Sequence, residues 1–247
     1  MYSRSNLVFP IACLLLVAAL VFHAFMQSDD VSAAELEKDA FEVALNPSRD
    51  YLILVNKDHE YKFGRSYDVS LKEDLIYATD CYRIPTLIEP AASLAFGMLR
   101  TRLHVMGYDI ELFSAYRTKK DQQWVVEMYG NDEEWTKRNT VLQPGYSEHH
   151  TGLTLSFMVW LEDDVGVGDW CEETSELREK LPELDAIRNQ LADFGFIERY
   201  PAGKEDITGV KYAPYEIRFV GSSKVAHEIM DNNLCLEEYL EEQESEK

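Results

Sequence analysis

The sequence has few basic residues: 24 Lys and Arg stand against 45 Asp and Glu, a formal net charge of −21. A surface this acidic repels the phosphate backbone of nucleic acids and the anionic headgroups of lipids. The composition therefore argues against a nucleic-acid partner, and solubility is the simplest role for most of the charge. Part of the excess lies in an acidic tail at residues 241–247.

Cysteines are too scarce for a disulfide framework. Of the four, Cys13 falls in an apolar run, which leaves Cys81, Cys171 and Cys235, an odd number. One bridge with a free thiol and three buried thiols both stay open. No CxxC pair occurs, which argues against a zinc site built from cysteines.

An uncharged apolar run occupies residues 7–26. About 20 such residues are enough to span a bilayer as a helix. Because Arg4 precedes the run and Asp29 and Asp30 follow it, we expect the N-terminus to stay in the cytoplasm and the rest of the chain to be exported.

Two alternatives to an uncleaved anchor remain open. A signal peptide could be cleaved near residues 31–33, and a lipoprotein site could lie at Cys13, although apolar sequence continues past it. The domain behind is extracytoplasmic in each case. The predicted organisation is a membrane anchor or signal segment at 1–28, a linker at 29–49, a domain at 50–240 and an acidic tail at 241–247.

The remaining chain mixes apolar patterns of both periods without a βαβ order, which predicts an α+β domain. No internal repeat is present. Expected strands cover 51–57, 110–117, 152–160 and 211–221, and expected helices cover 89–109, 118–131, 175–195 and 222–242.

The stretch "PGYSEHHTGLTLSFMV" at 144–159 has the form of a metal-binding motif, with adjacent histidines and a glycine before a buried strand. Together with "FSAYRTKKDQ", "FGFIERYPAGKEDITGVKYAPYEIRFVG" and "LEEYL", it resembles the VanY-type D-alanyl-D-alanine carboxypeptidases, zinc enzymes that trim peptidoglycan stem peptides. The resemblance runs from Tyr51 to Leu240. It implies a small central antiparallel sheet flanked by helices.

The resemblance also implies a site with three zinc ligands and one base. The ligands are the His and Asp of S-x-H-x-x-G-x-x-x-D and the His of a later E-P-W-H, whose Glu activates the zinc-bound water. Here Ser147, His149 and Gly152 match the first motif, but its Asp is replaced by Ser156.

The second motif is altered further. Ala213 replaces the base and Glu216 replaces the second histidine, so three of the four catalytic positions have changed. His149 and Glu216 remain as weak candidate metal ligands, short of the usual three. A site for a harder cation with oxygen ligands from Glu216, Glu148 or a water is conceivable, but no spacing rule supports it. We therefore expect no zinc cofactor unless the site is competent in some other way.

The residues around the predicted catalytic positions match the family more closely. The resemblance places Arg117 in the cleft, where a guanidinium can grip a peptide carboxylate with two parallel hydrogen bonds. The predicted substrate-binding residues are Ser114, Arg117, Gln122, Ser147 and Tyr215.

Several residues also have plainer interpretations. His149 could only hold a turn, His150 is expected to be exposed, and Glu216 could form an ion pair with Arg117 or Arg218. The tryptophans expected to pack in the core are Trp124, Trp160 and Trp170.

We therefore expect a pseudoenzyme that binds peptidoglycan stem peptide or an envelope protein. The alternatives are an active D,D- or L,D-carboxypeptidase with an unusual metal shell, and a purely structural part of an envelope complex.

Overall fold

The computed structural model describes residues 41, 44–62, 76–79, 85–138, 140–161, 165–168 and 181–245. The apolar run at 7–26, three of the cysteines and Trp170 lie outside these residues. Within the described part, no helix is both long and apolar enough to cross a bilayer, and Cys235 is buried as a free thiol.

The described elements alternate irregularly between helix and strand, as the sequence predicts. In chain order they are β1 Ile76–Thr79, β2 Pro85–Ile88, α4 Pro90–Val105, β3 Asp109–Ser114, α5 Lys119–Tyr129, α6 Glu133–Arg138, the 3-10 helix η3 Glu148–Thr151, β4 Thr154–Leu161, β5 Val165–Val167, α7 Pro182–Leu191, the 3-10 helix η5 Ala192–Phe194, β6 Phe196–Glu198, α8 Glu205–Thr208, β7 Glu216–Phe219, α9 Ser223–Asp231 and α10 Leu236–Ser245.

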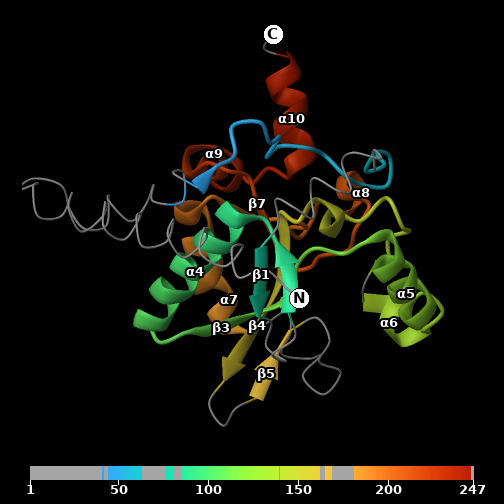
Figure 1. The fold of residues 1–247 in the computed structure, drawn as a ribbon, viewed down its shortest axis with the longest axis horizontal. Coiled ribbons are helices and arrows are strands. Elements are labelled where there is room, and N and C mark those ends of the chain that lie inside the picture. The colour runs from blue at the N-terminus through green and yellow to red at the C-terminus, as the bar shows by residue number, and fades with distance from the viewer. Residues whose placement is uncertain are drawn as a thin grey trace, which may run out of the picture.

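An antiparallel sheet forms the centre of the domain (Figure 1). Its strands run in the order β3-β4-β7-β6, with β5 paired to the far end of β4, while β1 and β2 form a separate hairpin. Strand β4 is buried from Thr154 to Val159, which matches the mostly apolar sequence of this stretch. The expected α+β fold is confirmed.

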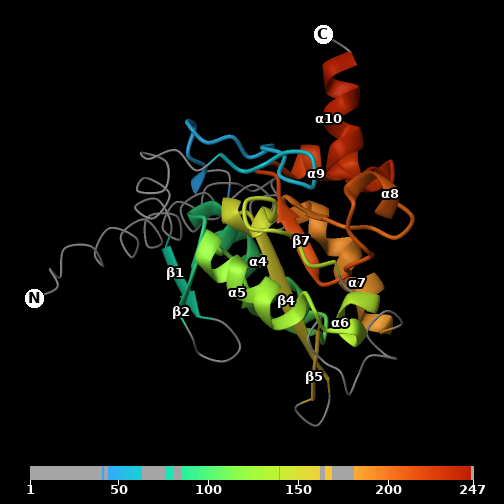
Figure 2. The same cartoon turned by 90° about the vertical axis from the view of Figure 1, so that its right-hand side faces the viewer.

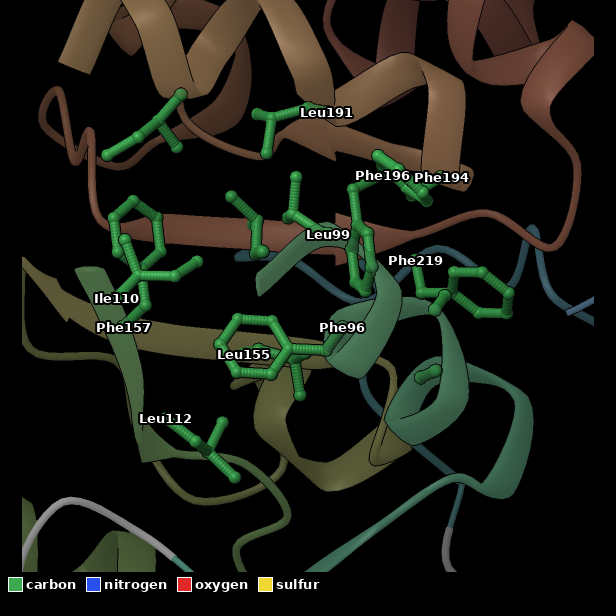
Figure 3. Packing of buried hydrophobic residues seen from close by; sticks show 14 of the residues in the cluster. Phe96, Leu99, Ile110, Leu112, Leu155, Phe157, Leu191, Phe194, Phe196 and Phe219 are labelled. Atoms are coloured by element: carbon green, nitrogen blue, oxygen red, sulfur yellow. The ribbon is translucent and has the colours of Figure 1, made fainter. Parts of the chain in front are cut away.

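Helix α4 covers one face of this sheet. Its buried side chains recur at helical spacing and include Phe96, Leu99 and Leu103. They meet aromatic and aliphatic residues of the strands and of α7, such as Phe157 and Phe219 (Figure 3). Helices α5 and α6 lie on the opposite side of β4 (Figure 2), so the sheet separates the main core from the face that carries the site.

Three expectations about local structure are wrong. Residues 51–57 form turns and irregular chain, because the carbonyls of Tyr51 and Ile53 accept hydrogen bonds from the Arg218 guanidinium instead of from a neighbouring strand. The helix expected at 222–242 is divided into α9 and α10 by Asn233, whose φ is 52°. Trp124 is 54% exposed on α5 rather than packed in the core.

Candidate functional site

The 3-10 helix η3 presents its two histidines in different directions. It ends at Gly152, whose φ of 71° is in the left-handed region that glycine adopts without strain. His149 Nδ1 lies 2.5 Å from the carbonyl oxygen of Ala115. This nitrogen therefore carries the proton, and Nε2 is directed at the end of strands β4 and β7.

Strand register brings the altered positions together at that point. Ser156 is paired with Glu216 between β4 and β7 and with Ser114 between β3 and β4. Ser156 Oγ donates to Glu216 Oε1 over 3.1 Å, and Glu216 Oε2 lies 3.2 Å from His149 Nε2. The two side chains at ligand positions of the motif thus both face the carboxylate of Glu216.

Glu216 is held as an anion. Burial alone raises the pKa of this carboxyl, but the charge of His149, its hydrogen bond and the charge of Arg117 outweigh burial and hold the pKa below its ordinary value. The sequence predicted Arg117 or Arg218 as the ion-pair partner of Glu216, whereas the structure places His149 Nε2 3.2 Å from its carboxylate. Arg218 instead pairs with Glu148.

His150 is fully buried, which corrects its expected exposure. Its Nδ1 donates to the carbonyl of Arg117 over 2.7 Å, and its Nε2 accepts from the backbone N–H of Gly145 over 2.9 Å. Burial lowers the pKa of His150 to about 4, which keeps the ring neutral. Both nitrogens are used to fix the turn, so His150 has none left for a metal.

The side chains at this site do not match the zinc ligands of the family that the sequence resembles. A zinc site uses at least three nitrogen, sulfur or carboxylate ligands, and Ser156 offers only a neutral hydroxyl. Among the described residues, no group of three or more His, Cys, Asp and Glu side chains is arranged to hold a metal. Ala213, at the position of the base, lines the pocket with a methyl group.

Glu148 pairs with two arginines, so its carboxylate is not directed at the Glu216 site. It is fully buried, with Oε2 2.6 Å from Arg218 Nη1 and Oε1 2.8 Å from Arg199 Nε. Arg199 also forms two hydrogen bonds with Glu237 of α10, at 2.8 and 3.0 Å, and Asn56 donates to the same carboxylate. This buried network fixes η3 to β7 and ties the projecting helix α10 to the domain (Figure 1).

The network makes the stability of the domain sensitive to acid. Burial raises the pKa of Glu237, but the Arg199 charge outweighs it and lowers the pKa to about 2. A carboxyl with a depressed pKa contributes stability that is complete above its unfolded value, near 4.5, and is lost as the pH falls toward 2. We expect urea unfolding midpoints to fall more steeply between pH 5 and pH 3 in the wild type than in Glu237→Gln. Parallel curves would contradict this assignment.

A pocket of about 80 Å³ opens beside Glu216. Arg117 reaches it with Nε donating to Ser114 Oγ over 3.2 Å and Nη1 donating to Gln122 Oε1 over 3.4 Å. Gln122 in turn donates to the carbonyl of Leu142 over 2.7 Å. Four of the predicted binding residues therefore lie together: Arg117, Gln122 and Ser147 line the pocket, and Ser114 orients the guanidinium.

Tyr215, the fifth predicted binding residue, lies elsewhere. It is fully buried against Phe157 in the main core, because neighbouring residues 215 and 216 point to opposite sides of the chain. Eight further residues line the pocket without a predicted role: Val125, Thr140, Val141, Leu142, Tyr200, Val210, Lys211 and Tyr212.

Comparison with known proteins places this geometry in a family. Residues 86–222 match the family model of VanY, D-alanyl-D-alanine carboxypeptidase. The chain is 31% identical over 209 residues to the putative carboxypeptidase YodJ of Bacillus subtilis strain 168, covering 82% of this chain and 71% of that protein. It is 34% identical over 116 residues to the bifunctional dipeptidase and carboxypeptidase VanXYC of Enterococcus gallinarum, covering 46% of this chain and 57% of that protein.

Solved structures of related proteins also match the fold of this chain. A mutant of the vancomycin resistance D,D-pentapeptidase VanY, in complex with Zn(II), aligns with a TM-score of 0.60 at 25% identity, over 78% of this chain and 99% of that one. The LdcB LD-carboxypeptidase aligns with a TM-score of 0.53 at 28% identity, over 80% of this chain and 79% of that one. The chain therefore belongs to the VanY D-alanyl-D-alanine carboxypeptidase family.

Proposed function

We propose that this protein is a non-hydrolytic member of the family that binds the free carboxyl end of a peptidoglycan stem peptide. One observation carries the proposal: the pocket keeps an oriented guanidinium at Arg117, while Ser156 and Glu216 form a hydrogen-bonded cluster with His149 and Ala213 lines the pocket beside it. The cluster offers no acceptor at Ala213 and no third ligand for an ion.

The charges of the pocket support a carboxylate ligand. In a chain of net charge −21, its lining contains the cationic groups of Arg117 and Lys211 against the single carboxylate of Glu216. A relative of known structure, VanYB, was solved in complex with D-Ala-D-Ala and aligns with a TM-score of 0.58 at 25% identity, over 77% of this chain and 97% of that one.

The apolar run at residues 7–26 supports a place for this site at the outer face of a membrane, where stem peptides are exposed. An envelope protein whose C-terminus enters the pocket is a second partner that uses the same contacts.

The binding test compares the full-length wild type with Arg117→Ala and Arg117→Lys in calorimetric titrations of D-Ala-D-Ala. A charge-assisted hydrogen-bond pair is worth about 1.5–3 kcal/mol, so we expect Arg117→Ala to weaken binding about ten- to a hundredfold. The affinity of Arg117→Lys should lie between those of the wild type and Arg117→Ala, because lysine keeps the charge but cannot make two parallel hydrogen bonds to a carboxylate.

Two controls make the result specific. The amide of D-Ala-D-Ala, which lacks the terminal charge, should bind the wild type about as weakly as the acid binds Arg117→Ala. Arg100→Ala removes another guanidinium, paired with Glu111 at the surface away from the pocket, and should leave binding unchanged. Equal affinity for acid and amide, or no binding of either, would contradict the proposed function.

A further inference from the structure

Residues 49–61, which we call the strap, cross the end of the domain from which α10 projects; they are drawn in blue to cyan in Figures 1 and 2. The strap consists of turns and irregular chain. Its side chains at Val55 and Tyr61 are nevertheless buried, and Asn56 donates to Glu237 of α10 over 3.0 Å. Packing and hydrogen bonds to other parts of the domain therefore hold the strap in place.

The strap contacts the loop 145–152, which contains η3, at both of its ends. After η3, the guanidinium of Arg49 donates to the carbonyl of Thr151. Before η3, the backbone N–H of Tyr61 donates to the carbonyl of Gly145 over 2.7 Å. Glu60 also packs against Gly145, where a Cβ atom would lie only 2.9 Å from Glu60 Oε1. The strap and this loop therefore fit closely together.

A third contact passes through Arg218 of β7. Its Nη2 donates to the strap carbonyls of Tyr51 and Ile53, each over 3.0 Å. Its Nη1 lies 2.6 Å from Glu148 Oε2 in η3. Because the Arg218 side chain is fully buried, it joins the strap to the middle of the loop through a fixed group.

The same loop positions the backbone of Arg117. The N–H of Arg117 donates to the carbonyl of His149 over 3.1 Å, and the carbonyl of Arg117 accepts from His150 Nδ1 over 2.7 Å. His150 Nε2 accepts from the backbone N–H of Gly145, the residue whose carbonyl the strap holds. Two hydrogen-bonded residues, Gly145 and His150, therefore connect the strap to Arg117.

We propose that the strap is a positioning element of the Arg117 pocket, with Arg49 as a positioning residue: docking of the strap orders the loop 145–152 in the geometry that binds a carboxylate. The inference rests on the proposed function and adds a control of that site, since displacing the strap weakens binding. Coupling between two equilibria is reciprocal, so a carboxylate bound at Arg117 also stabilises the docked strap.

Calorimetric titrations of D-Ala-D-Ala into the full-length chain test the effect of the strap on the pocket. Arg49→Ala removes the donor to Thr151 and should weaken binding about two- to tenfold, the effect that one lost hydrogen bond can transmit. Arg49→Lys should restore most of the affinity, because one ammonium donor is enough for one carbonyl. Arg100→Ala removes the same charge at a surface ion pair with Glu111 and should leave binding unchanged.

The titrations are made at a temperature at which circular dichroism shows every variant to be folded. A loss of global stability alone then leaves the affinity unchanged, whereas a shift of the loop lowers it. The rescue by Arg49→Lys also distinguishes residue 49 from residue 117, where lysine should recover only part of the affinity.

Hydrogen exchange of the wild type tests the reciprocal effect without a variant, since amide exchange reports local opening. Saturating D-Ala-D-Ala should slow exchange in residues 49–61 as well as in residues 145–152, and should leave α7 unchanged. In Arg117→Ala at the same ligand concentration, the slowing in the strap should disappear.

Three results would overturn the positioning role while the binding of D-Ala-D-Ala to the wild type still supports the Arg117 pocket. They are equal affinities of the wild type and Arg49→Ala, an equal loss of affinity in Arg49→Ala, Arg49→Lys and Arg100→Ala, and exchange in the strap that does not change with ligand. Failure of the wild type to bind D-Ala-D-Ala would instead overturn the proposed function, and this inference with it.

Discussion

A chain carrying Ser156→Asp, Ala213→Glu and Glu216→His together is expected to bind zinc stoichiometrically and to release D-alanine from a stem pentapeptide, whereas the wild type does neither. The reason is geometric. Ser156 and Glu216 are paired across β4 and β7, and the Glu216 side chain already reaches within 3.2 Å of His149 Nε2. Asp, His and His149 at these positions supply the three ligands that the present donor set lacks.

A matched double variant separates metal binding from proton transfer. Ser156→Asp with Glu216→His restores the ligands and keeps the methyl group of Ala213, so it should hold zinc and remain slower than the triple variant by about 10²–10⁴-fold, the usual contribution of a general base. The measurements are metal content after chelation and zinc addition, and D-alanine release. Stoichiometric zinc in the chelated and reloaded wild type, with release of D-alanine, would show instead that the protein is an active carboxypeptidase with an unusual metal shell.

Glu148→Ala is expected to destabilise the domain by about 3–5 kcal/mol, because it leaves the guanidinium groups of Arg199 and Arg218 buried with a partner removed. All three side chains are fully buried, and both ion pairs lie within 2.8 Å. The change in the free energy of unfolding is measured by urea denaturation followed by circular dichroism.

An exposed ion pair provides the matched control for Glu148→Ala. Lys119 and Glu60 lie 3.3 Å apart with both side chains about half exposed, so Lys119→Ala should change the free energy of unfolding by no more than about 1 kcal/mol. A loss below about 1 kcal/mol for Glu148→Ala would mean that the network contributes little to stability and serves only to orient η3.

Local patterns predicted the parts of the site that depend on neighbouring residues. The S-x-H-x-x-G spacing singled out His149, and the structure puts this histidine in a short turn that Gly152 closes. The apolar run of β4 identified the central strand. The substitutions at 156, 213 and 216 could be read directly, because each stands at a fixed distance from residues that still match the motif.

Tertiary contacts decided the roles that the sequence analysis misjudged. His150 is a neutral, buried part of the turn because its two ring nitrogens form hydrogen bonds with the backbone of Gly145 and Arg117. The residues next to His150 in the sequence do not indicate that these two backbone groups would be its partners. Tyr215 points into the core because the strand register places its neighbour Glu216 on the pocket side.

The sequence alone thus determined the family and the α+β class and predicted the loss of the zinc ligands and base, because these follow from residue types at short, fixed spacings. The structure decided that His149, Ser156 and Glu216 form one cluster, that Glu148 pairs with two arginines, and that Lys211 donates to Thr140 in the wall of the Arg117 pocket. Those outcomes join residues as far as 71 positions apart, such as Thr140 and Lys211. Only the packed strands and loops bring such residues into contact.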